Sequence, residues 1–167
     1  MNHKEAKEKF LETWGTLGTQ WGINKTIAQI HALLLISPNP ISTDNVMEEL
    51  MISRGNANMS LRSLLDWQLI YKKSIPGDRK EYFIAEKDIW KWSHRIAKIR
   101  KQKELNPMLE ALTELSTVKK GTNPAEKEFD KQIKELKDFT VMIDSLGDKL
   151  INSNKGEMLM KIMKLIL

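Results

Sequence analysis

Between Ser53 and Asp66 the sequence carries polar and cationic side chains at helical spacing. At 100° per residue, the apolar members of this run share one face: Ala57, Leu61, Leu64 and Leu65. The opposite face and its flanks carry the groups that can bind a ligand: Arg54, Asn56, Met59, Ser60, Arg62 and Ser63. Arg and Asn can hydrogen-bond base edges, Arg and Ser can bind phosphate, and Met can contact a thymine methyl group. The face suits duplex recognition; the alternative for Met59 is contact with a neighbouring helix.

A second cationic group lies between residues 69 and 84. The runs LIYKKSI and RKEYFI flank the turn Pro76-Gly77-Asp78, which predicts a β-hairpin. Four cations belong to this hairpin: Lys72, Lys73, Arg79 and Lys80. We expect Lys73, Arg79 and Lys80 to contact phosphates, with Asp78 orienting the side chain of Arg79 or Lys80. The alternative is an ordinary solvated turn.

The net charge of the chain becomes informative once it is located. The 167 residues carry 27 Lys and Arg against 22 Asp and Glu, a net charge of +5. Segment 52–103 alone holds 13 basic and 5 acidic residues, which is +8, and the other 115 residues sum to −3. Such asymmetry is typical of a polyanion-binding module, although a solvated helix face would also account for it.

Four helices and the hairpin must position these groups. Apolar periodicity predicts helices over 4–20, from Asn24 to about 36, from Ser42 to about 50, and from Ser53 to about 67. Asn24, Ser42 and Ser53 are the expected N-caps, and the free backbone N–H groups next to Ser53 can receive a phosphate. This order of elements is that of a winged helix-turn-helix, in which a short turn holds the recognition helix against the major groove.

The rest of the chain shows only helical signals. We expect helices over about 86–105, from Pro107 with Asn106 as its cap, from Pro124 to about Leu146, and a last one after residue 154. Their apolar stripes predict a C-terminal helical dimerisation lobe, the alternative being a bundle within one chain. The fold class is therefore mainly α with a small β-hairpin wing. The expected domains are 1–85, which binds DNA, and 86–167, which links and dimerises.

Several function classes are disfavoured. The chain has no cysteine, no Gly-rich phosphate loop and no HExxH motif, so we expect no enzymatic activity, no cofactor and no metal site. His31 lies on an apolar helix, as a core histidine would, and His94 lies in a basic one. No apolar run is long enough to cross a membrane, and the charged N-terminus is unlike a secretory signal, so we expect a cytoplasmic protein without a membrane partner.

Five tryptophans are many for this length: Trp14, Trp21, Trp67, Trp90 and Trp92. Aromatic cages bind quaternary ammonium groups, so one alternative is that these rings form a site for a small-molecule effector. We favour ordinary packing of these rings, and the identity of any effector is unknown.

The stretch from Trp21 to Ala85 resembles a known family. Its segments WGINKTIAQIHALLLISPNPIS, DNVMEELMISRGNANMSLRSLLDWQLI and IPGDRKEYFIAEKDIW are similar to the MarR-type winged-helix transcription regulators, especially their GbsR-type branch. The resemblance implies a homodimer on a palindromic operator. It also implies recognition by Arg54, Asn56, Met59, Ser60 and Arg62, with wing contacts from Arg79 and Lys80. The chain departs from the pattern at Met51, where Gly is common, and at Asn45, where a capping-box Glu is expected.

The leading hypothesis is thus a sequence-specific double-stranded DNA-binding regulator, most simply a repressor that acts as a homodimer. The alternative is a winged-helix protein that serves protein interaction without specific DNA readout. Steep salt dependence of duplex binding would distinguish the first from the second.

Overall fold

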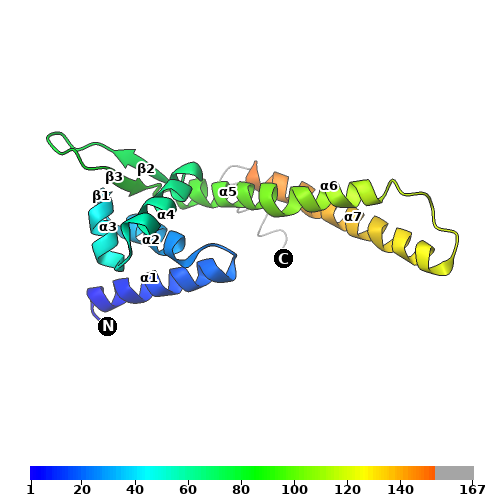
Figure 1. The fold of residues 1–167 in the computed structure, drawn as a ribbon, viewed down its shortest axis with the longest axis horizontal. Coiled ribbons are helices and arrows are strands. Elements are labelled where there is room, and N and C mark those ends of the chain that lie inside the picture. The colour runs from blue at the N-terminus through cyan, green and yellow to red at the C-terminus, as the bar shows by residue number, and fades with distance from the viewer. Residues whose placement is uncertain (153–167) are drawn as a thin grey trace. The chain divides into compact units, whose positions relative to one another are not determined.

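The computed structural model describes residues 1–152, which form two compact units. The first unit is Met1–Arg95, and the second begins at Ile96. Figure 1 shows the helices and strands of both. The last predicted helix, after residue 154, lies outside the described residues.

The four predicted helices of the first unit are confirmed: α1 (His3–Gln20), α2 (Lys25–Ile36), α3 (Thr43–Leu50) and α4 (Arg54–Asp66). Their N-caps are local and readable from the sequence. The side chains of Asn24, Ser42 and Ser53 accept hydrogen bonds from backbone N–H groups of the helix that follows each, which satisfies donors that a helix start otherwise leaves free.

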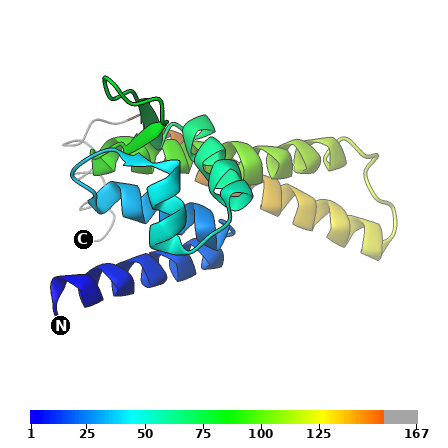
Figure 2. The same ribbon diagram turned by 60° about the vertical axis from the view of Figure 1, so that its left-hand side comes forward.

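The tight turn between α3 and α4 depends on a left-handed residue. Met51 ends α3 with φ 50° and ψ 48°, and its side chain is 92% exposed. This is the position at which the resemblance described above leads one to expect Gly, and the left-handed conformation gives a steric reason for that expectation, because a Cβ atom disfavours it. The turn forms nonetheless and sets α4 against α2 and α3 (Figure 2).

The predicted hairpin is confirmed as β2 (Ile70–Lys73) and β3 (Tyr82–Ala85). A third strand, β1 (Ile41–Ser42), was not predicted and pairs antiparallel with β3, giving the order β1-β3-β2. Its register sets Ser42 opposite Tyr82. Because Ser42 also caps α3, this short strand ties the start of α3 directly to the wing.

Helices α1 to α4, strands β2 and β3 and the turn before β2 contribute to the apolar core of the first unit. Its buried side chains are Leu11, Ala28, Ile30, Ala32, Leu33, Leu34, Val46, Ala57, Leu61, Leu64, Leu69, Ile70, Phe83 and Ala85. The predicted apolar face of α4 is confirmed, with Leu65 half-buried. The core therefore fixes which face of α4 points outward.

The predicted helix over 86–105 is in part wrong. The α-helix α5 covers Ile89–Arg100, and a π-helical segment, η1 (Lys101–Leu105), follows it and leads directly into α6 (Asn106–Leu115). The N–H of Asn106 donates to the carbonyl of Lys101, five residues back, so Asn106 is within the helix and is not its cap. Pro107 has no N–H to donate, and the wider π turn accommodates it without ending the helix.

In the second unit α6 packs against α7 (Pro124–Ile151). The connection between them is closed by two carboxylates of α7. Glu126 Oε2 accepts from the N–H of Thr122 at 2.6 Å, and Asp130 Oδ2 accepts from the N–H of Gly121 at 2.7 Å. A Cβ at Gly121 would lie 2.2 Å from the Glu126 side chain, so only Gly permits this approach.

Candidate nucleic-acid interface

The outward face of α4 carries most of the side chains that the helical pattern assigned to it. Arg54 and Arg62 are exposed, Ser63 is half-buried, and the N-cap Ser53 is exposed. Met59 is 63% exposed, so most of its side chain is free of packing against the described residues. A large apolar side chain on a polar, cationic face is unusual, and contact with an apolar group of a ligand would account for it.

Ser60 is a correction to the predicted surface. It is only 1% exposed, and its hydroxyl donates to Asn56 Oδ1 at 3.4 Å. A position on the flank of a helix faces whatever lies beside the helix, and here a neighbouring element covers it. Asn56 is half-buried as well and donates from Nδ2 to Thr26 Oγ1 of α2 at 3.2 Å. Asn56 is therefore partly engaged by the scaffold, and Ser60 is not available to a ligand.

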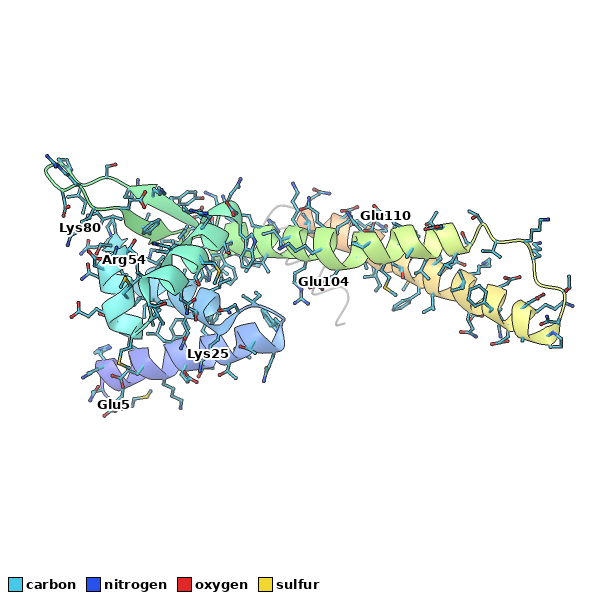
Figure 3. The ribbon with its side chains drawn as sticks, viewed as in Figure 1. Glu5, Lys25, Arg54, Lys80, Glu104 and Glu110 are labelled. Carbon is cyan, nitrogen blue, oxygen red and sulfur yellow. The ribbon has the colours of Figure 1, made fainter. Side chains whose placement is uncertain are left out.

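One carboxylate joins the start of α4 to the wing. Asp44, in the first turn of α3, accepts from Arg54 Nη2 at 2.6 Å on its Oδ1 atom. Its Oδ2 atom lies 3.6 Å from Lys80 Nζ. Figure 3 shows Arg54 and Lys80 near each other on the two elements. Two cations that are 26 positions apart in the sequence thus meet at one acidic residue.

The turn of the wing is ordered by Asp78. Its Oδ1 accepts from the backbone N–H of Lys80 at 2.8 Å, and its Oδ2 accepts from the Tyr82 hydroxyl at 2.7 Å. These bonds, the one from Lys80 first, hold the pKa of Asp78 below its ordinary value. Asp78 was expected to orient a cationic side chain, and its hydrogen bond instead goes to the backbone of Lys80.

Three predicted cations of this region have no partner within the described chain. Their side chains, those of Arg62, Lys73 and Arg79, are exposed and make no hydrogen bond or ion pair with residues 1–152. Lys72, by contrast, pairs with Glu81 across the hairpin. Unpaired guanidinium and ammonium groups can bind phosphate without first giving up an internal contact.

Sequence reasoning missed a polar network at the base of the wing. Arg95 donates to the Tyr71 hydroxyl at 2.8 Å and to the carbonyl of Gln68, and the Tyr71 hydroxyl donates to Glu86 at 3.0 Å. The network joins the end of α4, strand β2 and α5. No local pattern signals it, because its members come from four separate segments.

A cation of the basic segment is used inside the scaffold. Lys87 Nζ donates to the carbonyls of Leu34, Leu35 and Ser37, each at 2.7 Å. These groups close the C-terminal end of α2, where a cation is favoured by the helix dipole and by carbonyls that lack partners. Lys87 therefore contributes to the +8 count but not to the exposed cationic face.

Two of the five tryptophans, Trp14 and Trp92, pack against each other and against His31. Trp14 and Trp92 are edge-to-face at 6.1 Å between ring centroids, and His31 is 5.4 Å from Trp92. Burial first, and then the charge of Lys87, lowers the pKa of His31 to about 4. His31 is thus a neutral core residue at neutral pH, in line with the preferred interpretation from its apolar helix.

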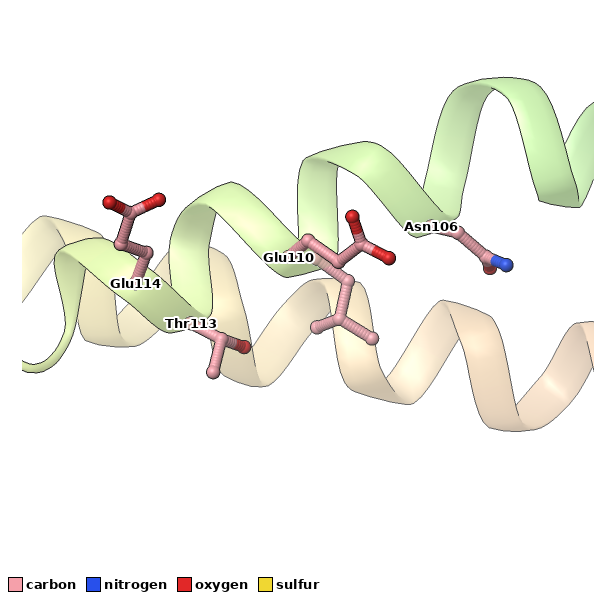
Figure 4. Close-up of a pocket in the computed structure, with 5 residues that line it drawn as sticks. Asn106, Glu110, Thr113 and Glu114 are labelled. Carbon is pink, nitrogen blue, oxygen red and sulfur yellow. The ribbon is translucent and has the colours of Figure 1, made fainter.

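Residues 1–152 offer little to an alternative chemistry. No three His, Asp or Glu side chains in this part of the chain are grouped to hold a metal ion. A hollow of about 460 Å³ runs along α6 (Figure 4), lined by Asn106, Leu109, Glu110, Thr113 and Glu114. Its lining includes no cation or histidine to act with the carboxylates. None of the described helices is both long enough and apolar enough to span a bilayer.

The second unit exposes the apolar stripe that the sequence predicted for it. Side chains of α7 that are at least about two-fifths exposed are Phe129, Leu136, Phe139, Val141, Met142, Ile143 and Leu146. Leu112 of α6 is the one fully buried apolar side chain that the described part of this unit contains. Such a surface on a helix is typical of an interaction site.

Comparison with known proteins agrees with the fold. No family model and no curated protein matches the chain. Among solved structures, a crystal structure of a transcriptional regulator matches with a TM-score of 0.60 at 17% identity, covering 87% of this chain and 95% of that one. An S. aureus MepR mutant bound to an oligodeoxyribonucleotide reaches a TM-score of 0.40 at 16% identity, covering 86% and 91%. The first likeness shows a mainly helical winged-helix fold; the second is too weak to support an argument.

Proposed function

We propose that this chain is a sequence-specific double-stranded DNA-binding transcriptional regulator of the MarR type, with GbsR-like features, that represses as a homodimer on a palindromic operator. The observation that carries the proposal is the outward face of α4 together with the wing. Both elements present cations that have no partner in the described chain, on a fold shared with a transcriptional regulator. In this proposal α4 enters the major groove and the wing contacts the adjacent backbone.

The roles of the residues follow from their exposure. Arg62 and Met59 are proposed to contact bases, since both side chains are exposed in the middle of α4. The proposed phosphate contacts are Ser53, Ser63, Lys73 and Arg79. Asn56 is a proposed base contact through the hydrogen-bonding groups of its amide that Thr26 does not use. Ser60 is not included because it is buried.

The homodimer is supported by the exposed stripe on α7. Burying apolar area contributes about 25 cal/mol per Å² to the free energy of association. Two chains whose α7 stripes are in contact are therefore more stable than two chains whose stripes both face water. A palindromic operator mirrors a two-fold protein, with half-sites about one helical turn apart. Analytical ultracentrifugation at micromolar concentration tests this: a dimer supports the proposal and a monomer contradicts it.

The DNA function is tested by selecting bound duplexes from a random pool. We expect a palindrome with half-sites about one turn apart. Arg62→Ala should weaken binding of that duplex by about 1–3 kcal/mol and relax the preference at one base pair of each half-site. Lys9→Ala is the matched control, because Lys9 is an exposed, unpaired cation on α1, which lies away from the wing in both views (Figures 1 and 2).

A different outcome would favour the alternative of an interaction protein. Duplex binding that is weak, selects no sequence and hardly changes with salt would contradict DNA readout. In that case the apolar stripe of α7 would be the working surface.

A further inference from the structure

We propose that Asp44 is a specificity-determining residue, which holds Arg54 for base readout and makes the same cation less available to phosphates of unrelated DNA. The inference rests on the proposed DNA function. Asp44 lies in the first turn of α3 and belongs to neither of the two elements that are expected to touch DNA.

The backbone holds Asp44 where α3, α4 and the wing come together. Strand β1 pairs Ser42 with Tyr82 of β3, and Ser42 then caps α3, so Asp44 lies two residues after the residue that pairs with the wing. Arg54 is the first residue of α4. The backbone position of Asp44 is therefore set by strand pairing and capping.

The contact leaves Arg54 most of its hydrogen-bonding capacity. Arg54 donates to Asp44 Oδ1 through Nη2, and a guanidinium group has five N–H donors in all. The side chain of Arg54 is 64% exposed, so the remaining donors face solvent. These donors can hydrogen-bond a base edge while the ion pair between Arg54 and Asp44 stays intact.

Binding to phosphate makes the opposite demand. A phosphate that takes Arg54 or Lys80 displaces them from Asp44 and leaves the carboxylate unpaired beside another anion, and like charges repel at this range. Lys80 is the more easily displaced, since its Nζ lies 3.6 Å from Asp44 Oδ2. Discrimination arises because the specific complex keeps the Arg54 pair and the unspecific complex breaks it.

The test compares Asp44→Asn with Glu48→Gln. Both remove one negative charge from α3, and the Glu48 side chain is exposed and has no partner within residues 1–152. We measure affinity for the duplex recovered by random-pool selection and for an unrelated duplex of the same length, over a range of salt. Asp44→Asn should raise affinity for the unrelated duplex by about three- to tenfold, with a steeper salt dependence, and should lower the ratio of the two affinities by a similar factor. Glu48→Gln should change the ratio by less than about twofold.

A second variant separates this role from a general effect of charge. In the Arg54→Gln background, the effect of Asp44→Asn on the affinity ratio should fall below about twofold. Equal effects of Asp44→Asn and Glu48→Gln, or an unchanged effect in the Arg54→Gln background, would overturn the inference while leaving the DNA function standing. A wild-type chain that selects no duplex would instead contradict the proposed function, and the inference with it.

Discussion

The two units of this chain handle their apolar side chains in opposite ways. In the first unit, Met1–Arg95, helices α1 to α4 and strands β2 and β3 bury Leu, Ile, Val, Ala and Phe side chains. In the second, α6 and α7 pack against each other, yet Phe139 is 58% and Leu136 is 44% exposed. A unit with a closed core can fold on its own contacts, whereas one that leaves such a stripe in water gains stability when a partner covers it.

The polar groups differ between the units as well. In the first unit the side chains of Arg62, Lys73 and Arg79, on α4 and the wing, have no partner within residues 1–152, while those of Lys87 and Arg95 support the scaffold. In the second, Lys101 of η1 lies 3.0 Å from Asp144 and also contacts Asp148, both on α7, and these aspartates raise its pKa. Charge in the second unit thus fixes the pairing of two helices, and charge in the first is left available to a ligand.

The largest effect expected from this difference comes from truncating one leucine in each unit. Leu61 of α4 is 2% exposed, so Leu61→Ala should lower the free energy of unfolding by about 2–5 kcal/mol, through lost burial and the cavity left behind. Leu136→Ala, at the exposed stripe, should cost less than about 1 kcal/mol at concentrations where the chain is monomeric. Urea unfolding followed by far-ultraviolet circular dichroism measures both variants, because the helices of both units contribute to that signal. All five tryptophans lie between residues 14 and 92, so tryptophan fluorescence reports on the first unit alone. Equal losses in the two variants would contradict the contrast.

The next effect is a pH dependence confined to the first unit. The pKa of His31 falls from 6.5 to about 4 on folding, so between these values the unfolded chain binds the proton and the folded chain does not. Stability from this residue is fully present above pH 6.5 and is lost as the pH falls toward 4, by up to about 3 kcal/mol. His31→Gln should flatten the dependence of tryptophan-detected unfolding on pH in this window. His3→Gln, at an exposed position, is the control and should leave the dependence unchanged.

The features that were predicted correctly from the sequence are those determined by residues close together in the chain. The N-caps Asn24, Ser42 and Ser53, the Pro-Gly turn and the apolar face of α4 each depend on neighbours within a few residues. The winged helix-turn-helix followed from their order. These features are local in physical origin, so one sequence suffices to find them.

The errors arose where distant segments meet. Strand β1 has two residues and no alternation to detect, and it exists because β3 offers a free edge. Ser60 was placed on the surface because a helical wheel shows angle and not what lies beside the helix. The π-helical segment before Pro107 was missed because proline usually ends a helix, and the wider turn that keeps it within one is rare. The partners of Asp44 and Arg95 were likewise invisible to local patterns.

A smaller effect is expected from the exposed apolar stripe of α7. Phe139→Ser removes a large exposed ring from α7 and should weaken association of the chains by about tenfold, as expected when an interface loses part of its apolar centre. The tryptophan-detected stability of the first unit in dilute solution should hardly change. Sedimentation equilibrium measures the association constant. Ile36→Ser, which removes an exposed apolar side chain from the first unit, is the control and should leave association intact; a Phe139→Ser dimer as strong as the wild type would place the interface elsewhere.

The smallest effect is expected at Met51 in the first unit, where a substitution should raise the free energy of unfolding rather than lower it. Met51 holds φ 50° with its side chain 92% exposed, so replacing it loses almost no contact and relieves the steric cost of a Cβ atom in the left-handed region. Glycine also gains freedom in the unfolded chain, which offsets part of this benefit. Met51→Gly should therefore raise the free energy of unfolding by only about 0.5–1 kcal/mol, measured by urea titration, while Met51→Ala, which keeps the Cβ atom, should not. A stabilised Ala variant would mean that the Met side chain, and not the left-handed backbone conformation, is the unfavourable feature of this turn.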